Sequence, residues 1–298
     1  MAQERIVYLN GNIVPESEAT VSIHDRGFLL GDAVFDTTRT FGHSIFRLHE
    51  HLDRLFDSLT YVRIDPGMSK SRMADLTMEV LEANLPLLEE GDDYWVTQRV
   101  SRGVRGSSDP TVIVECHPIP FAQRASYYRD GLRVITPSVR RTPPESISPR
   151  AKTHNYLNLV LADLEVKERD PDAWAILLDL NGNLAEGEGS NFFIVRDGAL
   201  ATPKPQYVLG GISRETTFEL AHELGIEVKE ADIDLFDAYI ADEAFITSTS
   251  LCICPVSAVN GAAIAGGMVP GPVTSRLQQA YSGLVSMDVV GQYLSRLG

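Results

Sequence analysis

Strand-like and helix-like segments follow one another along this chain without regular alternation, and this pattern constrains the fold more than any other feature. Apolar residues recur at helical spacing over residues 47–62, and residues 73–88 repeat the pattern. Two strand-like runs, 94–100 and 111–116, then come in direct succession. A doubly wound parallel sheet requires strands and helices to alternate, so the order of segments predicts an α+β fold.

The second half of the sequence continues the mixture. Residues 132–135 read as a strand, and residues 155–168 read as a helix whose apolar stripe is Leu157, Val160, Leu161 and Leu164. A hairpin is expected over residues 174–184 around Asn181-Gly182, because Asn-Gly suits a turn that needs positive φ. Helices are expected over 213–224 and 271–285.

The length of 298 residues fits one large domain or two domains of ordinary size. The character of the sequence changes at Pro118 and Pro120. We therefore expect a small N-terminal α+β domain over residues 1–120, a linker over 121–130 and a larger C-terminal domain over 131–298.

Charge and cysteine usage exclude several classes of function. The formal net charge is −15 and the sequence pI is near 4.9, which disfavours nucleic acid and anionic membranes as partners. The cysteines are few and odd in number, so a disulfide framework is not indicated: Cys116, Cys252 and Cys254. With neither a signal-peptide run nor an apolar segment of membrane-spanning length, we expect a soluble cytoplasmic protein.

Lysine is rare, which directs attention to Lys152. The other four lysines each have a plain surface interpretation: Lys70, Lys167, Lys204 and Lys229. Lys152 follows a Pro- and Ser-rich loop and precedes an apolar helix. A partly buried lysine can act as a nucleophile toward carbonyl groups. From local context alone, a solvent-facing loop lysine is the more frequent outcome.

Two glutamates, Glu186 and Glu188, lie among small residues between two strand-like runs. Glycine allows the backbone to approach a ligand closely, so one carboxylate here could hold a proton on a ring nitrogen. A solvated turn with two ordinary glutamates is the alternative.

Two segments suit a phosphate group. The sequence LGGIS over residues 209–213 opens a helix, so free backbone N–H groups point at whatever lies there. The hydroxyl run TSTS over 247–250 follows a strand, although Ser and Thr also favour caps and turns. Arg54 could add a positive charge; its alternative is a surface ion pair with Asp53, Asp57 or Glu50.

Other types of site are not indicated. Cys252 and Cys254 have no second pair and no nearby histidine, so we expect no metal site. The run His49-Glu50-His51 lacks the spacing of a zinc protease, and we expect these residues to face water. The sequence GEGSN is not a nucleophile elbow, and Walker and G-x-G-x-x-G loops are absent.

Taken in order, the motifs resemble the fold-type IV pyridoxal-phosphate enzymes. This group contains branched-chain aminotransferases, D-amino-acid aminotransferases, (R)-selective amine transaminases and aminodeoxychorismate lyases. The matching segments are YLNGNIVP, SIHDRGFLLGDAVFDTTRT, FRLHEHLDRL, VSRG, AKTHNYLNLVLA, LAEGEGSNFFIV, LGGISRETTFELAHELGIEV and ADEAFITSTSLCICPV. The resemblance implies two α+β domains, pyridoxal 5′-phosphate as cofactor and a homodimer.

The resemblance also implies residue roles. Lys152 would join the cofactor aldehyde covalently and then move a proton between the substrate Cα and the cofactor. Glu186 would keep the pyridine nitrogen protonated, so that the ring accepts electron density. The remaining cofactor contacts would come from Arg54, Tyr156, Ile212, Ser213 and Thr249.

Substrate selection would come mainly from the small domain. Phe35 and Thr37 fall where relatives line the pocket. Trp95 and Thr97 stand where typical branched-chain enzymes carry Tyr and Arg, and the loop around Arg105 lacks the Arg-x-His of D-amino-acid enzymes. Arg105 could meet a carboxylate or simply face solvent, and backbone N–H groups near Thr249 and Ser250 could hold the substrate carboxylate.

The sequence therefore predicts a transaminase that moves an amino group to a 2-oxo acid by a ping-pong mechanism. Because Thr97 removes a fixed charge, we expect hydrophobic amino acids or an (R)-configured primary amine as donor. The alternatives are a branched-chain L-amino-acid or D-amino-acid aminotransferase, and a lyase of the aminodeoxychorismate type.

Overall fold

The computed structural model describes residues 4–264 and 268–297 and divides the chain into two compact units. The first unit contains the residues up to Ile119 together with Ala151–Asn155, and the second contains Pro120–Arg150 and Tyr156 onward. Residues 121–130, expected to form a linker, are instead a helix that clusters with the second unit. The segment that carries Lys152 clusters with the first unit.

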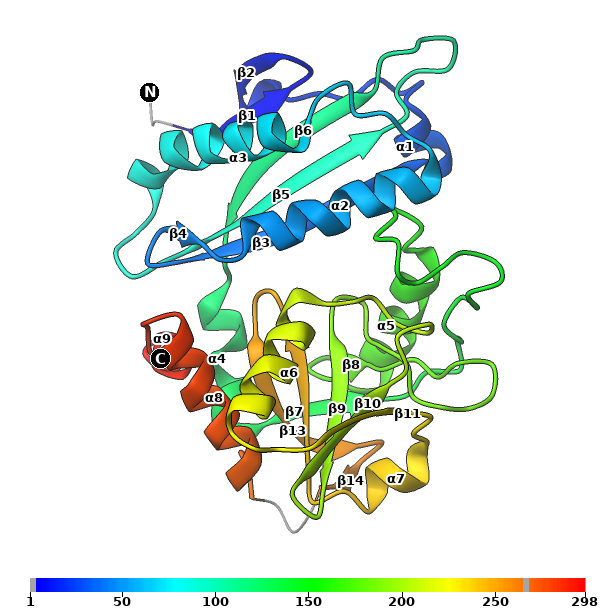
Figure 1. The fold of residues 1–298 in the computed structure, drawn as a ribbon, viewed down its shortest axis with the longest axis vertical. Coiled ribbons are helices and arrows are strands. Elements are labelled where there is room, and N and C mark those ends of the chain that lie inside the picture. The colour runs from blue at the N-terminus through cyan, green and yellow to red at the C-terminus, as the bar shows by residue number, and fades with distance from the viewer. Residues whose placement is uncertain (1–3, 265–267, 298) are drawn as a thin grey trace. The chain divides into compact units, whose positions relative to one another are not determined.

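An antiparallel sheet forms the first unit, and its strand order is β2-β1-β6-β5-β3-β4 within the residues that the structure describes. Helices α2 and α3 lie across one face of this sheet (Figure 1). The strands are β1 (Ile6–Leu9), β2 (Asn12–Pro15), β3 (Ala33–Phe41), β4 (Ser44–Ile45), β5 (Tyr94–Ser101) and β6 (Thr111–Pro118). The helices are α1 (Arg26–Leu30), α2 (Leu48–Val62) and α3 (Lys70–Asn84), with short 3-10 turns at Glu16–Glu18 and Leu85–Leu87.

Side-chain alternation along the strands gives this sheet two different faces. Buried apolar residues such as Val96, Val100 and Val114 point at α2 and α3 and form the core with Leu52 and Leu55. The opposite face carries polar and aromatic residues, and we call it the polar face of the first sheet: Phe35, Thr37, Trp95, Thr97, Arg99 and Glu115.

A mixed sheet forms the second unit, in the order β11-β10-β9-β12-β13-β7-β8 with β14 beside β13, among the described residues. Its strands are β7 (Leu132–Ile135), β8 (Trp174–Ala175), β9 (Asn191–Arg196), β10 (Ala199–Pro203), β11 (Val228–Ala231), β12 (Glu243–Ser248), β13 (Cys252–Val259) and β14 (Ala262–Ala263). Its helices are α4 (Phe121–Asp130), α5 (Leu157–Arg169), α6 (Ile212–Glu223), α7 (Leu235–Tyr239), α8 (Pro272–Leu284) and α9 (Val289–Leu294).

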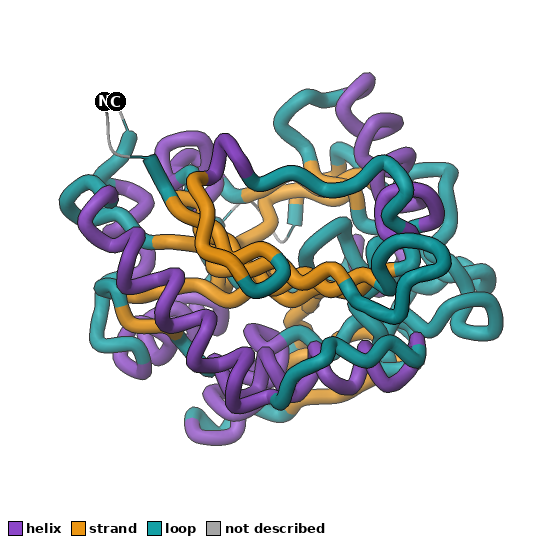
Figure 2. Tube along the Cα trace, turned by 90° about the horizontal axis from the view of Figure 1, so that it is seen from above, coloured by secondary structure: helices purple, strands orange, loops and turns teal. Residues whose placement is uncertain are grey.

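Both units combine a sheet with helices and long loops rather than an alternating parallel array, so the α+β prediction is confirmed (Figure 2). The hairpin expected over 174–184 forms only in part. Strand β8 ends at Ala175, and Leu178 meets Leu184 through a single bridge.

Helix α5 forms as predicted, but its apolar stripe is exposed and does not pack against the core of the second unit. Leu157, Val160, Leu161 and Leu164 are exposed, with Leu157 at 70% and Leu164 at 55%. The core of the second unit is contacted instead by Leu159, Ala162 and Val166, which pack against Ala173, Ala175 and Leu177. The periodicity thus identified a helix with two apolar sides.

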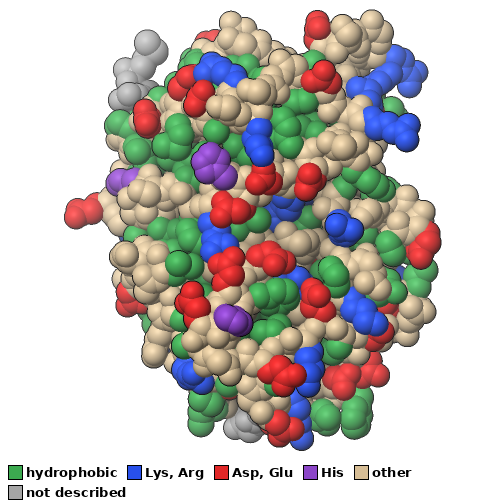
Figure 3. Space-filling model, viewed as in Figure 1, with side chains coloured by type: hydrophobic (Ala, Val, Ile, Leu, Met, Phe, Trp, Pro, Cys, Tyr) green, Lys and Arg blue, Asp and Glu red, His purple; other side chains and the backbone are tan. Residues whose placement is uncertain are grey.

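On the face shown in Figure 3, Asp and Glu side chains are interspersed with Lys and Arg. None of the helices in residues 4–264 and 268–297 is long and apolar enough to cross a membrane.

Candidate active site

The backbone of Lys152 is fixed by hydrogen bonds within the first unit. Its carbonyl accepts from the Phe35 N–H at 3.0 Å, and its own N–H donates to Ser58 Oγ at 3.0 Å. The neighbouring His154 N–H donates to the Ala33 carbonyl at 2.9 Å. Residues 152–154 therefore run along the start of β3, where Thr153 and Val34 form an isolated antiparallel bridge.

The side chain of Lys152 lies against an aromatic ring. Its Nζ is 4.4 Å from the centroid of the Phe35 ring, a cation–π geometry that directs the amine over the polar face of the first sheet. The other lysines make surface contacts: Lys70 with Asp53, Lys204 with Asp232, Lys229 with Glu227, and Lys167 with the Ala173 carbonyl. Lys152 thus differs from them in its surroundings as well as in its sequence context.

Arg54 pairs with a buried carboxylate instead of its surface neighbours. Its Nε donates to Asp36 Oδ2 at 2.8 Å and its Nη2 to Asp36 Oδ1 at 2.7 Å. Asp36 is completely buried on β3. Burial alone would raise the pKa of Asp36, but the Arg54 charge and His51 hold that pKa well below its ordinary value. The carboxylate is therefore ionised and keeps the guanidinium in one orientation.

His51 does not face water, so that part of the prediction for residues 49–51 was wrong. His51 is 2% exposed, and its Nδ1 lies 2.7 Å from Asp36 Oδ1. Burial lowers its pKa, although Asp36 opposes the shift. The sequence held a signal for this: His51 stands three residues after Leu48 and four before Leu55, on the buried side of α2.

Ser58 connects Arg54 to Lys152. Its hydroxyl donates to the Arg54 carbonyl at 2.8 Å and accepts from the Lys152 N–H. Helix α2 therefore positions both residues through one side chain, one helical turn beyond Arg54.

The polar face of the first sheet brings together the four residues predicted to bind substrate from β3 and β5. Thr37 and Thr97 are directly opposite in the strand register, and their hydroxyl oxygens are 3.0 Å apart. Phe35 stands opposite Arg99, and Trp95 lies on the same face two residues before Thr97. Arg105, in contrast, lies exposed in the loop between β5 and β6.

In the second unit, a tight turn presents Glu186 to the interior. The Gly187 N–H donates to the Ser190 carbonyl at 2.9 Å, and Glu186 pairs with Asn191 at the start of β9. The Glu186 carboxylate accepts from Arg141 Nε at 2.8 Å and from the Leu209 N–H at 2.8 Å. Glu186 is buried whereas Glu188 is exposed, which distinguishes the two glutamates.

The hydrogen bond from Leu209 joins Glu186 to the start of α6. Asn191 Nδ2 donates to the Leu209 carbonyl at 3.0 Å, and a Cβ on Gly211 would approach Asn191 Oδ1 to 2.2 Å. Helix α6 begins at Ile212 without a side-chain cap, so its first N–H groups depend on other partners. The close packing explains why glycine occupies position 211.

Ser213 links the start of α6 to the turn after β12. Its hydroxyl donates to the Ser248 carbonyl at 3.0 Å. Ser248 Oγ accepts from the Leu251 N–H at 3.0 Å, so residues 248–251 form a compact turn that contains Thr249 and Ser250. The turn is held by side chains from α4 and α9: Arg124 donates to Ser250 Oγ, Tyr128 to the Leu251 carbonyl and Tyr293 to the Ser250 carbonyl.

Comparison with known proteins identifies this arrangement. The family model described as amino-transferase class IV matches residues 33–259. A putative branched-chain-amino-acid aminotransferase of Methanocaldococcus jannaschii is 40% identical over 283 residues, which cover 92% of this chain and 94% of that protein. The chain belongs to the class IV aminotransferases.

Solved structures of class IV aminotransferases agree with this assignment. The Escherichia coli branched-chain amino acid aminotransferase superposes with a TM-score of 0.88 at 30% identity, covering 95% of each chain. A branched-chain amino acid aminotransferase of T.th., solved with pyridoxamine 5′-phosphate, gives a TM-score of 0.84 at 29% identity, covering 96% of this chain and 95% of that one. The protein is a pyridoxal-phosphate-dependent aminotransferase, as its sequence predicted.

The residues of this class IV aminotransferase fit the cofactor. Lys152 would supply an amine for the aldehyde, and the buried Glu186 would supply an anion for a protonated ring nitrogen. Among the described residues, Ser190 Oγ and Thr247 Oγ1 are buried without a hydrogen-bond partner, and Thr247 stands opposite Asn191 in the sheet. Buried hydroxyl groups need hydrogen-bond partners. These two hydroxyls, together with the N–H donors at the start of α6, give the second unit polar groups that a polar ligand could bind.

Sequence reasoning missed several residues that help to build the site. Asp36 and His51 orient Arg54, Ser58 fixes Lys152, Arg141 holds Glu186, and Arg124 holds the turn at Ser250. Burial lowers the pKa of Arg124, whose guanidinium also lies 5.8 Å from the Trp174 ring centroid. Strand and helix periodicity gives no indication of such long-range partners.

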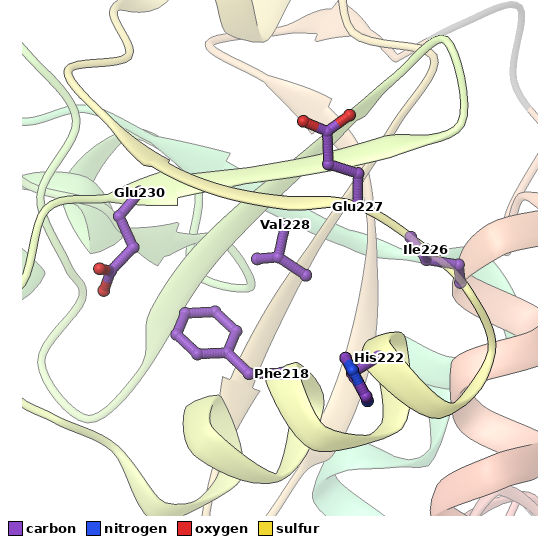
Figure 4. A pocket seen from close by; sticks show the side chains of 6 residues that line it. All are labelled: Phe218, His222, Ile226, Glu227, Val228 and Glu230. Atoms are coloured by element: carbon purple, nitrogen blue, oxygen red, sulfur yellow. The ribbon is translucent and has the colours of Figure 1, made fainter.

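A hollow of about 440 Å³ lies apart from the predicted residues. It is lined by side chains of α6, β11 and the connection between them: Phe218, His222, Ile226, Glu227, Val228 and Glu230 (Figure 4). None of these residues belongs to the predicted site, and Glu230 pairs with the buried Arg214.

Tyr156 occupies the position just before α5. Its side chain is partly buried and packs against the apolar cluster of Leu159 and Ala162. Its predicted contact with the cofactor remains a prediction.

Proposed function

We propose that the protein is a branched-chain L-amino-acid aminotransferase, which transfers the amino group of a branched aliphatic amino acid to a 2-oxo acid. The observation that carries the proposal is the 40% identity to a relative of that description over 92% of this chain. The apolar rings of Phe35 and Trp95 on the polar face of the first sheet support it, because they offer contact surface for an aliphatic side chain.

The comparisons favour this alternative over the (R)-amine activity that the sequence led us to expect first. That expectation depended on Thr97 leaving the pocket without a fixed charge. Arg99 stands on the same face two residues later, so a guanidinium is present after all. Amine turnover, D-amino-acid turnover and lyase chemistry become outcomes of the substrate test.

The contacts within each unit support the residue roles that we propose. The bound cofactor supplies an electron sink for the bond changes at the substrate Cα. Lys152 carries the proton between Cα and the cofactor, and Phe35 orients its amine. Glu186, held by Arg141, keeps a proton on the ring nitrogen. The same active site would serve donor and acceptor in turn, as a ping-pong mechanism requires.

The phosphate of the cofactor would be bound by two kinds of group: a positive charge and directed N–H donors. Arg54, oriented by Asp36, supplies the charge. The N–H groups of Ile212 and Ser213 supply donors at the start of α6, and Thr249 supplies a further contact. Backbone groups near Ser250 would hold the substrate carboxylate.

We further propose that the chain works as a homodimer. Four exposed apolar residues gather on one helix, α5, in a stripe of the kind that marks an interaction surface: Leu157, Val160, Leu161 and Leu164. A second copy is the partner that the family resemblance implies.

The three free cysteines are all buried, which agrees with the reducing cytoplasm that we expect for this enzyme.

A substrate screen tests the proposed function. Purified holoenzyme is assayed at equal concentrations of L-leucine, L-valine, D-alanine and (R)-1-phenylethylamine, with 2-oxoglutarate and pyruvate as acceptors. We expect the branched L-amino acids to react fastest. Dominant turnover of the amine or of D-alanine would contradict the proposal, and release of the substrate without transfer of its amino group would indicate a lyase.

A further inference from the structure

The chain from Lys152 to His154 is paired with the start of β3 so that both of these side chains share one side with Phe35. The Phe35 N–H donates to the Lys152 carbonyl at 3.0 Å, and Thr153 forms an antiparallel bridge with Val34. Side chains alternate along paired strands. Residues 152 and 154 therefore project to the side of Phe35, and residue 153 projects to the side of Val34.

The Phe35 ring contacts both side chains. Lys152 Nζ is 4.4 Å from the ring centroid. The His154 ring meets the Phe35 ring edge to face, with the centroids 5.2 Å apart and an interplanar angle of 73°. Such a pair favours one relative orientation, because the positive edge of one ring is attracted to the negative face of the other. The ring on which the lysine amine lies is therefore held by the residue two positions after that lysine.

The polarity of the His154 ring is not used by the fold. Its Nε2 is buried and has no hydrogen-bond partner among the residues that the structure describes. A buried polar atom without a partner costs free energy, and an aliphatic side chain of similar size would avoid that cost. Groups of this kind occur at functional sites. The place of the imidazole beside Lys152 therefore explains it better than packing does.

His154 is a neutral ring among charged groups. Burial lowers its pKa to about 4, and the positive charges of Arg99 and Lys152 act in the same direction. The carboxylates of Glu115 and Asp25 oppose these effects without reversing them. At neutral pH the imidazole therefore adds no further cation beside the lysine amine, and it acts on the neighbouring aromatic ring through its shape and its quadrupole.

We propose that His154 is a positioning residue for Lys152, which acts through the ring of Phe35. The imidazole edge holds that ring in the orientation on which the amine lies. This inference rests on the role that we propose for Lys152 and adds a residue to the same site. A change at residue 154 should therefore alter the reactivity of the lysine amine.

The test measures that amine directly. The full-length protein, freed of cofactor, is labelled with trace acetic anhydride over a pH range that includes the ordinary lysine pKa of about 10.4. Mass spectrometry then gives the labelling rate and the apparent pKa of Lys152. Lys70 in the same sample is the reference, because it is exposed and pairs with Asp53 at the surface. The kcat of each holoenzyme with a branched L-amino acid is measured in parallel.

Three substitutions at one position separate the aromatic edge from its volume. His154→Ala removes the contact, His154→Leu restores bulk without an aromatic edge, and His154→Phe restores the edge without a titratable group. His49→Ala is the matched control, because His49 is an exposed histidine of the same unit. Circular dichroism and urea unfolding show whether each variant is folded.

We expect Lys152 to be labelled about two- to tenfold faster in His154→Ala and His154→Leu, the range that corresponds to one aromatic pair. Its ammonium form loses the fixed contact with the ring, so its apparent pKa should fall. Values of kcat should fall by a similar factor. His154→Phe should remain within about twofold of the parent, and Lys70 should be labelled equally in all variants.

Labelling of Lys152 at the parent rate in folded His154→Ala would overturn the inference. If His154→Ala does not fold, His154→Leu and His154→Phe decide it, because equal rates in these two variants would show that the aromatic edge has no effect. A parent that fails to convert branched L-amino acids would show that the proposed function is wrong. The labelling of Lys152 needs no substrate, so it tests the role of His154 in either case.

Discussion

Arg54 and Asp36 form a two-point ion pair inside the first unit, with N–O distances of 2.8 and 2.7 Å. Arg54 comes from α2 and Asp36 from β3, so the pair joins a helix to the sheet beneath it. An arginine fixed in this way presents its remaining donors in one direction, which suits recognition of a phosphate.

Asp36→Asn should therefore reduce both stability and cofactor affinity. The change leaves the Arg54 charge partly buried without its anion, and such a loss costs about 3–5 kcal/mol in the free energy of unfolding. Urea unfolding and cofactor titration measure the two effects. Asp53→Asn, which breaks the exposed pair with Lys70, is the control and should cost about 1 kcal/mol or less. Similar losses in the two variants would show that burial of Asp36 has no special effect.

Lys152 should be the residue that reacts with the cofactor. Borohydride reduction of the holoenzyme followed by peptide mapping should place the pyridoxyl group on Lys152. Lys152→Ala should lose turnover, whereas Lys70→Ala should keep it, because Lys70 is an exposed surface residue. A label on any of the other four lysines would refute the assignment.

Glu186→Gln should keep the cofactor bound but slow turnover. A neutral amide does not favour a protonated ring nitrogen, and loss of a proton-holding group slows reactions by about 10²-fold or more. Absorbance of the bound cofactor and kcat are the measurements. Glu188→Gln is the matched control, since Glu188 is exposed two residues away. Near-normal turnover in Glu186→Gln would contradict the role.

Stability should fall as the pH is lowered from 6.5 toward 5. Burial lowers the pKa of His154 to about 4 and also lowers that of His51. In this range the unfolded chain therefore binds a proton on His154 that the folded protein does not bind, and it binds more protons on His51 than the folded protein does, so acid favours unfolding. Each histidine contributes a slope of about 1.4 kcal/mol per pH unit at most.

Urea unfolding at several pH values measures this slope. His154→Gln should flatten it, whereas His49→Gln should not, because His49 is exposed. The pKa of His117 is raised by its hydrogen bond with Glu115. The stability that His117 contributes is therefore present below pH 6.5 and is lost above it, outside this test. An unchanged slope in His154→Gln would show that His154 is protonated in the folded protein.

Leu161→Glu should convert the proposed dimer into a monomer. The substitution puts a charge in the middle of the exposed stripe on α5, where burial against a second copy would be costly. Sedimentation velocity measures the state of association. Leu284→Glu on α8 is the control, because Leu284 is a similarly exposed leucine of the second unit. A dimer that survives Leu161→Glu would place the interface elsewhere.

The sequence predicted the elements better than their surroundings. Helices α2, α3, α6 and α8 and the strands β5, β6 and β7 lie where periodicity and turn residues indicated. Periodicity records which residues share a face, but it does not say what covers that face. For this reason α5 was predicted correctly as a helix, but the pattern did not show that Leu157, Val160, Leu161 and Leu164 would be exposed.

For the candidate site as well, the sequence indicated local motifs but not the contacts between residues far apart in the chain. Lys152, Glu186 and the start of α6 could be proposed as site residues because motifs of adjacent residues point to them. Asp36, Ser58, Arg141 and Arg124 act over long separations in the chain, and a single sequence contains no measure of such pairings. Arg99 was overlooked although it stands two residues after Thr97, the spacing that puts both on one face of a strand.

Residues 151–155 limit where the chain can be cut into separate fragments, because they belong to the first unit. The chain leaves the second unit at Arg150, contributes five residues to the first, and returns at Tyr156. Ala33, Phe35 and Ser58 hold this run, and all three precede residue 120. A fragment starting at Pro120 would retain Glu186 and α6 but would carry Lys152, the lysine that we expect to react with the cofactor, on an unsupported loop. The larger unit is thus no minimal catalyst, and any split or permuted version must supply the first 119 residues before Lys152 can be positioned.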